Sequence, residues 1–237
     1  LYIRRMDGAL GMTVPPHKPV PLPSQQGEGA AMIVPTNKTP MPFLSEFLTT
    51  SFQNVRSSKR TDELHKALLN EILNQNPDLA EYDWKFEYQL KEDAFGGTFD
   101  IDIVGFDADG DMRVAILAKA INSNVNKNIK NYANTTIGEA ARLYYAPGCN
   151  SIEKILFVSV LPRLAPRFNI AGDVVGFDDV ISAKNRTKLD DVLQRQYHGA
   201  VETMDLYFDI EDVTTRVNKE GYDVINPTNL TPIPMIW

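Results

Sequence analysis

The spacing of apolar positions changes near residue 84, from a helical period to the period of a strand. Residues 61–75 carry apolar side chains three and four positions apart, as on one face of a helix. Thr61 suits the N-cap position and Pro77 follows just beyond the expected end. The pattern therefore predicts a helix over 61–75, and a shorter helix is expected over 43–56.

Three strands are predicted after this helix. Residues 84–90 alternate apolar and polar side chains, which is typical of a half-buried strand. Residues 98–106 form the second expected strand, and a tight turn around Gly110 leads to a third over 112–120. This third segment reads MRVAILAKA and is nearly all apolar, so we expect it in the centre of a sheet.

Beyond residue 120 the pattern is less regular. Residues 122–134 show no clear period. The elements expected further on are a helix at 136–145, a buried strand at 154–161, an irregular stretch at 162–172, a short strand at 174–177, a polar helix at 185–197 and an element of either kind within 200–217. This order predicts an α/β fold, with a mixed central sheet flanked by helices.

The N-terminal segment differs from the rest in composition. Eight of the fifteen prolines stand between residues 13 and 42, and proline removes backbone donors and fixes φ. We therefore interpret residues 1–42 as an extended Pro-rich arm that lies on the protein or on a partner subunit. Residues 43–237 are expected to form a single domain.

Charge and cysteine content narrow the class of protein. The 237 residues carry a net charge of −7, which argues against a nonspecific nucleic-acid coat but allows a local basic cleft. Cys149 is the single cysteine, so no internal disulfide forms, which fits a reducing compartment. No apolar run reaches the length of a membrane span, and we expect a soluble, cytoplasmic protein. The three histidines are scattered in sequence and predict no histidine-based metal or catalytic cluster.

Candidate chemistry is concentrated in the hairpin of the second and third strands. Asp100 and Asp102 are two residues apart, so on a strand they point to the same face. Magnesium prefers oxygen ligands, usually one or two carboxylates with waters, and these two aspartates are the predicted Mg²⁺ ligands. Lys119 stands at the end of a buried strand, where an unpaired ammonium is costly unless carboxylates lie beside it.

Residues 97–119, GTFDIDIVGFDADGDMRVAILAK, resemble the catalytic hairpin of the PD-(D/E)XK nuclease superfamily, which includes many type II restriction endonucleases. The resemblance extends over about residues 60–162. It implies a restriction-endonuclease-like core and a Mg²⁺-dependent, sequence-specific endodeoxyribonuclease that hydrolyses phosphodiester bonds of double-stranded DNA, usually as a homodimer. Asp100 and Asp102 would then hold the metal, and Lys119 would position or activate the attacking water.

The chain departs from the family pattern at one position. The acid that the family places two residues before the lysine is replaced by Leu117, which cannot bind a metal. Three interpretations remain open: a naturally inactive relative, an inactivated variant, or an acid supplied from elsewhere. Glu139 on the next predicted helix and Glu87 on the preceding strand are the candidates for that acid.

The charge becomes basic after Lys119, which suggests where DNA would bind. Lysine and arginine neutralise phosphates, and asparagine pairs with adenine in the major groove. The predicted DNA-binding residues are Asn122, Asn124, Asn126, Lys127, Asn128, Lys130 and Arg142. The alternative for this segment is a solvated polar loop.

Two other functions stay open at this point. Leu117 favours a catalytically inactive, nuclease-like module that binds nucleic acid or assembles with other proteins. A structure-specific nuclease of repair or phage origin is the second alternative, and the asparagine-rich segment speaks slightly against it.

Overall fold

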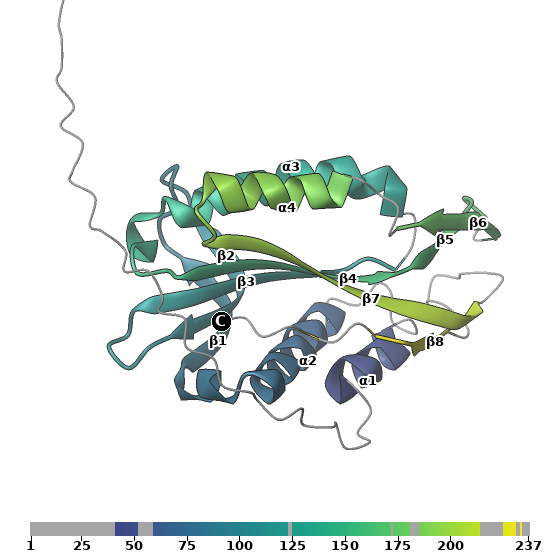
Figure 1. The fold of residues 1–237 in the computed structure, drawn as a ribbon, viewed down its shortest axis with the longest axis horizontal. Helices are drawn as coiled ribbons and strands as arrows, with labels where there is room; N and C mark the ends of the chain where they lie inside the picture. Colours follow the sequence, from purple (N-terminus) through teal and green to yellow (C-terminus); the bar gives the residue numbers. More distant parts are fainter. Residues whose placement is uncertain are drawn as a thin grey trace, which may run out of the picture. The chain divides into compact units, whose positions relative to one another are not determined.

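A six-stranded mixed sheet forms the centre of the fold, in the order β1-β2-β3-β4-β7-β8 (Figure 1). The computed structural model describes residues 41–51, 59–122, 125–171, 173–180, 185–213, 225–230 and 233. The strands of this sheet are β1 (Asp83–Leu90), β2 (Phe99–Phe106), β3 (Met112–Ala120), β4 (Lys154–Pro162), β7 (Val201–Val213) and β8 (Ile225–Thr228). A separate two-stranded sheet consists of β5 (Leu164–Phe168) and β6 (Val174–Asp179).

Two layers of helices enclose the large sheet (Figure 1). Helices α1 (Pro42–Ser51) and α2 (Lys59–Gln75) cover one face, and α3 (Val125–Tyr144) and α4 (Asn185–Gln196) cover the other. Short 3-10 turns follow α2 at η2 (Pro77–Glu81) and α3 at η3 (Pro147–Cys149). The α/β architecture with a mixed sheet flanked by helices, predicted from the sequence, is thus confirmed.

Strand pairing follows from how the chain connects the strands. The pairs β1–β2, β2–β3 and β7–β8 are antiparallel, whereas β3–β4 and β4–β7 are parallel. Parallel neighbours need a crossover, and the crossovers after β3 and β4 contain α3 and α4. Strand β3 lies between β2 and β4 and is buried over most of its length, as its apolar sequence predicts.

Each face of the sheet carries its own core of buried side chains. We call them the α1/α2 core and the α3/α4 core. Neighbouring residues of β3 alternate between them, so Ile116 packs in the α1/α2 core and Leu117 in the α3/α4 core. A sheet covered on both faces explains why β3 and β4 read as nearly continuous apolar runs.

Two predictions about elements were wrong. Residues 122–134 were expected to lack regular structure, but α3 already begins at Val125. Asparagine is a weak helix former, and here the packing of buried Val125 and Tyr132 outweighs that preference. The stretch 162–172 was expected to be irregular, but it contains β5, whose Pro166 is tolerated because the small sheet has only edge strands.

Other predictions are settled only in part. The helix expected over 43–56 is α1, described to Ser51, while residues 52–58 lie outside the described part of the chain. The element within 200–217 is strand β7. Residues 1–40 of the predicted Pro-rich arm also lie outside the described residues. In the described ranges, no helix has both the length and the apolarity needed to span a membrane.

Candidate functional site

Strands β2 and β3 stop pairing next to Asp102, one of the predicted site residues. Their register runs from Phe106 opposite Met112 to Ile103 opposite Ile116 and then ends. The next residue of β2, Asp102, instead accepts a hydrogen bond on its side-chain Oδ2 from the backbone N–H of Ala118, at 2.7 Å. A carboxylate thus takes the place of a ladder bond, and a gap opens between two strands of the sheet.

An open pocket of about 410 Å³ lies at this separation. Its wall combines side chains of α1 and α2 with the end of β3: Phe47, Thr61, Leu64, Asp102, Ala118, Lys119, Ala120 and Ile121. The pocket therefore contains both the aspartate and the lysine of the predicted catalytic hairpin.

Glu139 of α3 approaches the same place from the other face of the sheet. Its Oε2 lies 3.7 Å from Nζ of Lys119, an ion pair too long for a hydrogen bond. This Oε2 is buried and accepts no hydrogen bond from the residues that the structure describes. Burial raises the pKa of Glu139 above its ordinary value; the ammonium of Lys119 opposes this shift and the carboxylate of Asp102 adds to it.

The Lys119 ammonium contacts the Glu139 carboxylate and the ring of Tyr132. Its side chain is 41% exposed, and Nζ lies 5.7 Å from the ring centroid of Tyr132, which is within reach of a cation–π contact. The hydroxyl of Tyr132 is in turn 2.7 Å from the hydroxyl of Ser159 on β4. The ring of Tyr132 is thereby fixed, while the ammonium keeps access to the pocket.

His65 is the residue that the sequence analysis missed. It lies on α2 with 0% exposure, its Nδ1 2.8 Å from Oε1 of Glu87 and its Nε2 3.6 Å from Oδ2 of Asp102. The expectation that no histidine-based cluster exists is therefore wrong for the described residues. A signal was present, because His65 stands three residues before Leu68 and seven before Ile72, on the buried face of the helix.

Asp100 lies outside this group. Its neighbours Phe99 and Ile101 pack in the α3/α4 core, so Asp100 lies on the other side of β2 from them. Asp100 is exposed, however, and its Oδ1 accepts a hydrogen bond from Nε2 of Gln89 at 3.0 Å. Of the two predicted metal ligands, only Asp102 lies in the pocket.

Leu117 occupies a core position and not a ligand position. It is 6% exposed, packs in the α3/α4 core and pairs with Phe157 of β4. An acid at this position would enter an apolar cluster, so the structure gives Leu117 a packing role.

The predicted DNA-binding residues separate into three groups. Arg142 donates hydrogen bonds from Nε to Asp93 at 2.5 Å and from Nη2 to the carbonyl of Thr98 at 2.8 Å, which ties it to the protein and not to a ligand. Asn122 is buried, and neither atom of its amide has a hydrogen-bond partner among the described residues. Lys127, Lys130, Asn126 and Asn128 lie on α3 with side chains outside the description, and Asn124 lies outside it altogether.

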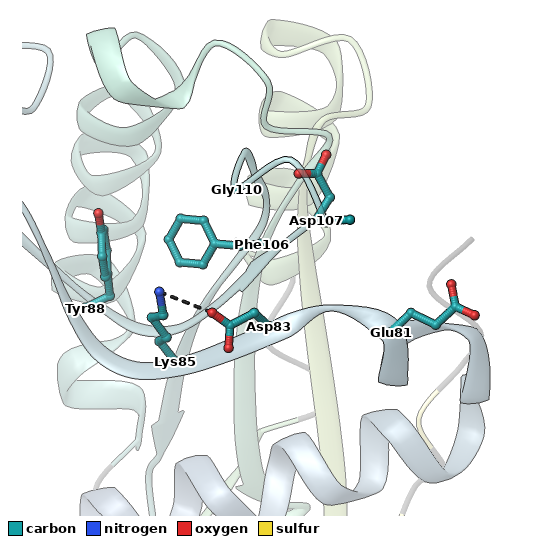
Figure 2. A pocket seen from close by; sticks show the side chains of 8 residues that line it. Glu81, Asp83, Lys85, Tyr88, Phe106, Asp107 and Gly110 are labelled. Carbon is teal, nitrogen blue, oxygen red and sulfur yellow. Dashed lines mark ion pairs between the residues drawn. The ribbon is translucent and has the colours of Figure 1, made fainter.

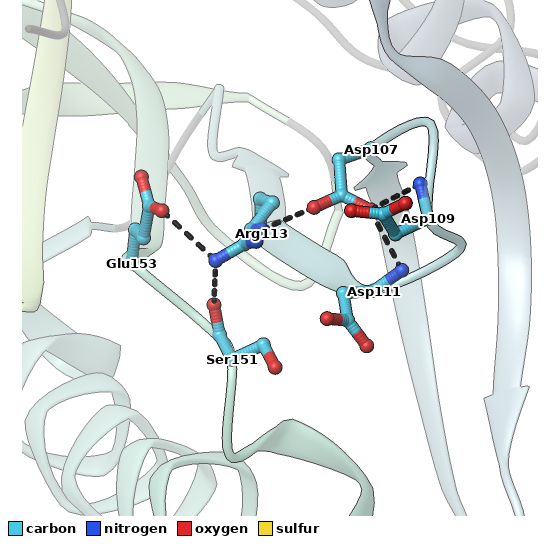
Figure 3. A network of polar contacts seen from close by, with 6 residues as sticks. All are labelled: Asp107, Asp109, Asp111, Arg113, Ser151 and Glu153. Atoms are coloured by element: carbon cyan, nitrogen blue, oxygen red, sulfur yellow. Dashed lines mark hydrogen bonds and ion pairs between the residues drawn. The ribbon is translucent and has the colours of Figure 1, made fainter.

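The other end of the β2–β3 hairpin is also rich in acids, and there the Asp107 carboxylate has its hydrogen-bond donors within the turn (Figure 3). Asp107 accepts hydrogen bonds from the N–H groups of Asp109 and Asp111 and from Nε of Arg113. The hydrogen bond from Arg113 is the largest cause that holds the pKa of Asp107 below its ordinary value. The turn is thus a closed structural network, as expected for Asp and Gly residues in turns.

A larger pocket of about 540 Å³ borders this turn (Figure 2). Its one ammonium, on Lys85, is paired with Asp83 at 3.2 Å and lies 4.6 Å from the ring centroid of Phe106. This pocket is the larger of the two, but it is not the candidate site. None of its lining residues has a buried polar side-chain atom without a hydrogen bond, unlike the group between β2 and β3.

Comparison with protein families, with characterised proteins and with solved structures finds no match to this chain. Its function therefore has to be argued from the site. Asp102 and Glu139 carry carboxylate oxygens, the ligands that Mg²⁺ prefers. The buried Oε2 of Glu139 accepts no hydrogen bond from the described residues. The donor chemistry of these two residues is the kind that a Mg²⁺ site needs.

Proposed function

We propose that this chain is a Mg²⁺-dependent DNA endonuclease with a restriction-endonuclease-like core, in which Asp102, Lys119 and Glu139 form the reactive centre. The observation that carries the proposal is the position of Glu139. It brings a partly buried carboxylate, whose Oε2 has no hydrogen bond among the described residues, to within 3.7 Å of the Lys119 ammonium, although the acid of the hairpin itself is replaced by Leu117. Of the interpretations open from the sequence, the geometry favours an acid supplied by a helix.

Hydrolysis of a phosphodiester needs charge stabilisation on the phosphate and an activated water. A Mg²⁺ ion held by Asp102 and Glu139 would supply both when bound. The N–H of Ala118 fixes one oxygen of Asp102, which orients the carboxylate toward the pocket without using its second oxygen. Lys119 donates from Nζ toward the attacking water or a phosphate oxygen, and its partial exposure lets it move between Glu139 and the substrate.

Sequence-specific binding to double-stranded DNA is part of the same proposal. The start of α3 carries Lys127 and Lys130 with several asparagines, and it follows directly on the strand that bears Lys119. Lysines there would neutralise phosphates next to the scissile bond, and asparagines would read bases. Type II enzymes of this kind act as homodimers on palindromic sites, and we propose the same for this chain.

The proposal is tested by incubating the chain with mixed-sequence plasmid DNA and Mg²⁺ and separating the products on a gel. We expect discrete fragments from the wild-type chain and a loss of about 1000-fold in rate for Lys119→Ala, since the lysine acts directly on the reacting groups. Lys85→Ala is the matched control, because Lys85 is a half-exposed lysine of β1 that lines the separate pocket beside the hairpin turn, and its loss should leave the rate unchanged.

Other outcomes decide between the alternatives. A smear without discrete fragments would favour a nuclease that does not read sequence. DNA binding without cleavage by the wild-type chain would contradict the proposal and favour the inactive binding module that Leu117 suggests. Equal cleavage by the wild-type chain and Lys119→Ala would remove Lys119 from the mechanism.

A further inference from the structure

His65, Glu87 and Asp102 come from three different elements and meet on the α2 side of the sheet. They belong to α2, β1 and β2, and one ligand atom from each lies within 4.8 Å of the others. An imidazole nitrogen with two carboxylates is a common donor set for divalent metals. Three such side chains from separate elements are held in place by the fold and not by local sequence.

The state of His65 is the first reason to regard this group as a site. The side chain is 0% exposed, and neither ring nitrogen makes a hydrogen bond with any residue that the structure describes. A buried polar group without a hydrogen bond destabilises the folded chain. An ion bound by one ring nitrogen would remove part of that cost.

The contact with Glu87 has the geometry of neighbouring ligands. Oε1 of Glu87 is 2.8 Å from Nδ1, a short distance, yet the contact is not a hydrogen bond. Two ligands at right angles on one ion, each bonded at about 2.1 Å, are roughly 3 Å apart and lie off each other's lone-pair axis. The observed approach resembles that arrangement more closely than it resembles a hydrogen bond.

The backbone of Glu87 is the second, independent reason. Its φ is 49°, the left-handed region, in strand β1 between Phe86 and Tyr88, which pair with Ile103 and Ile101 of β2. Such a conformation is unfavourable for a non-glycine residue and persists where the surrounding structure compensates for it. It turns the Glu87 carboxylate toward His65, and the 52% exposure of this side chain leaves a route for an ion from solvent.

We propose that His65, Glu87 and Asp102 bind a divalent transition metal ion of the Mn²⁺ or Zn²⁺ type. The imidazole nitrogen favours such an ion over Mg²⁺, which prefers oxygen ligands alone. Asp102 would then contribute a carboxylate both to this site and to the proposed Mg²⁺ site. The proposal does not depend on DNA cleavage, because it concerns binding to the free chain.

The test is a Mn²⁺ titration of the metal-free chain, followed by electron paramagnetic resonance in the presence of excess Mg²⁺. We expect one bound Mn²⁺ whose spin-echo spectrum shows an imidazole nitrogen. His65→Gln should abolish that nitrogen signal, and Glu87→Gln should weaken Mn²⁺ binding by at least about 10-fold. Because Glu87 is half-exposed, its variant should fold even if the change at buried His65 disturbs the core.

Glu63→Gln is the matched control, an exposed acid on the same helix as His65 that should bind Mn²⁺ like the wild-type chain. Lys119→Ala separates the two proposals, because it should lose cleavage and keep Mn²⁺ binding. Wild-type binding without an imidazole signal, or unchanged Mn²⁺ affinity in both His65→Gln and Glu87→Gln, would overturn the site. Cleavage could still occur in that case, so the proposed function would stand or fall by its own test.

Discussion

The two ends of the β2–β3 hairpin contain similar numbers of acids but differ in how those acids are satisfied. At the turn, Asp107 has two backbone donors and Arg113, and Arg113 also reaches Glu153 and the carbonyl of Ser151 (Figure 3). At the other end, Glu139 and His65 have buried atoms without hydrogen bonds among the described residues.

This difference shows which polar groups stabilise the fold and which remain free for a ligand. A buried acid whose hydrogen bonds are complete contributes to stability and gains little from a metal. A buried acid or imidazole without partners costs free energy in the folded chain, and such costs are found at functional sites. The number of acids does not distinguish the two ends, whereas the buried polar atoms without hydrogen bonds point to the separated strands.

The largest effect on stability is expected from Leu117→Glu. The substitution places a carboxylate in the α3/α4 core beside Phe157, which should cost roughly 3 kcal/mol or more in the free energy of unfolding. Urea unfolding measures this loss, and Leu117→Met is the control, with an expected cost below about 1.5 kcal/mol. A well-folded Leu117→Glu chain that cleaves DNA faster than wild type would show that residue 117 is the acid position after all.

Glu139→Gln should have opposite effects on cleavage and stability. Cleavage should fall by at least about 10-fold, because the amide binds a cation more weakly than the carboxylate. Since burial raises the pKa of Glu139 in the folded chain, the folded state binds its proton more tightly than the unfolded state does. The stability of the wild-type chain relative to Glu139→Gln should therefore be highest below the ordinary glutamate pKa and decrease as pH rises through the raised value.

Urea unfolding of both chains over a pH series, with chelator present, measures this decrease. If the wild-type chain gained stability over Glu139→Gln with rising pH, the acid would be well paired in the fold, and its assignment as an unsatisfied ligand would be wrong.

The smallest effect is expected from Arg113→Ala at the turn. Loss of its hydrogen bond to Asp107 should reduce the free energy of unfolding only slightly, because two backbone N–H groups still hold that carboxylate and solvent screens the ion pair. Cleavage should stay at the wild-type rate. A large loss of cleavage with little loss of stability would mean that the turn belongs to the functional site.

Local pattern predicted a large part of the fold. Residues 84–90, which alternate, lie in β1, and the apolar run 112–120 is β3. Successive side chains of a strand point to opposite faces of the sheet, so the order of polar and apolar residues indicates how each face is buried. The start of α3 was missed because asparagine has weak helix propensity, and only packing on the sheet makes residues 125–135 helical.

The site was predicted in part. Asp102, Lys119 and Glu139 were named from the order of residues along a hairpin and the helix after it. Three other features depend on contacts between distant segments. Asp100 accepts a hydrogen bond from Gln89, and Arg142 is bonded to Asp93. His65 lies close to two carboxylates.

The sequence by itself determined the alternating strands, the helix that carries His65 and the acids that surround the hairpin turn. Only the tertiary structure decided which of those acids are satisfied. The reason is physical: secondary structure depends on neighbours within a few residues, whereas the partners of a buried charge come from elements far apart in the chain. His65 and Glu87 are 22 positions apart and Lys119 and Glu139 are 20, so their contacts exist only once the sheet and its helices have packed.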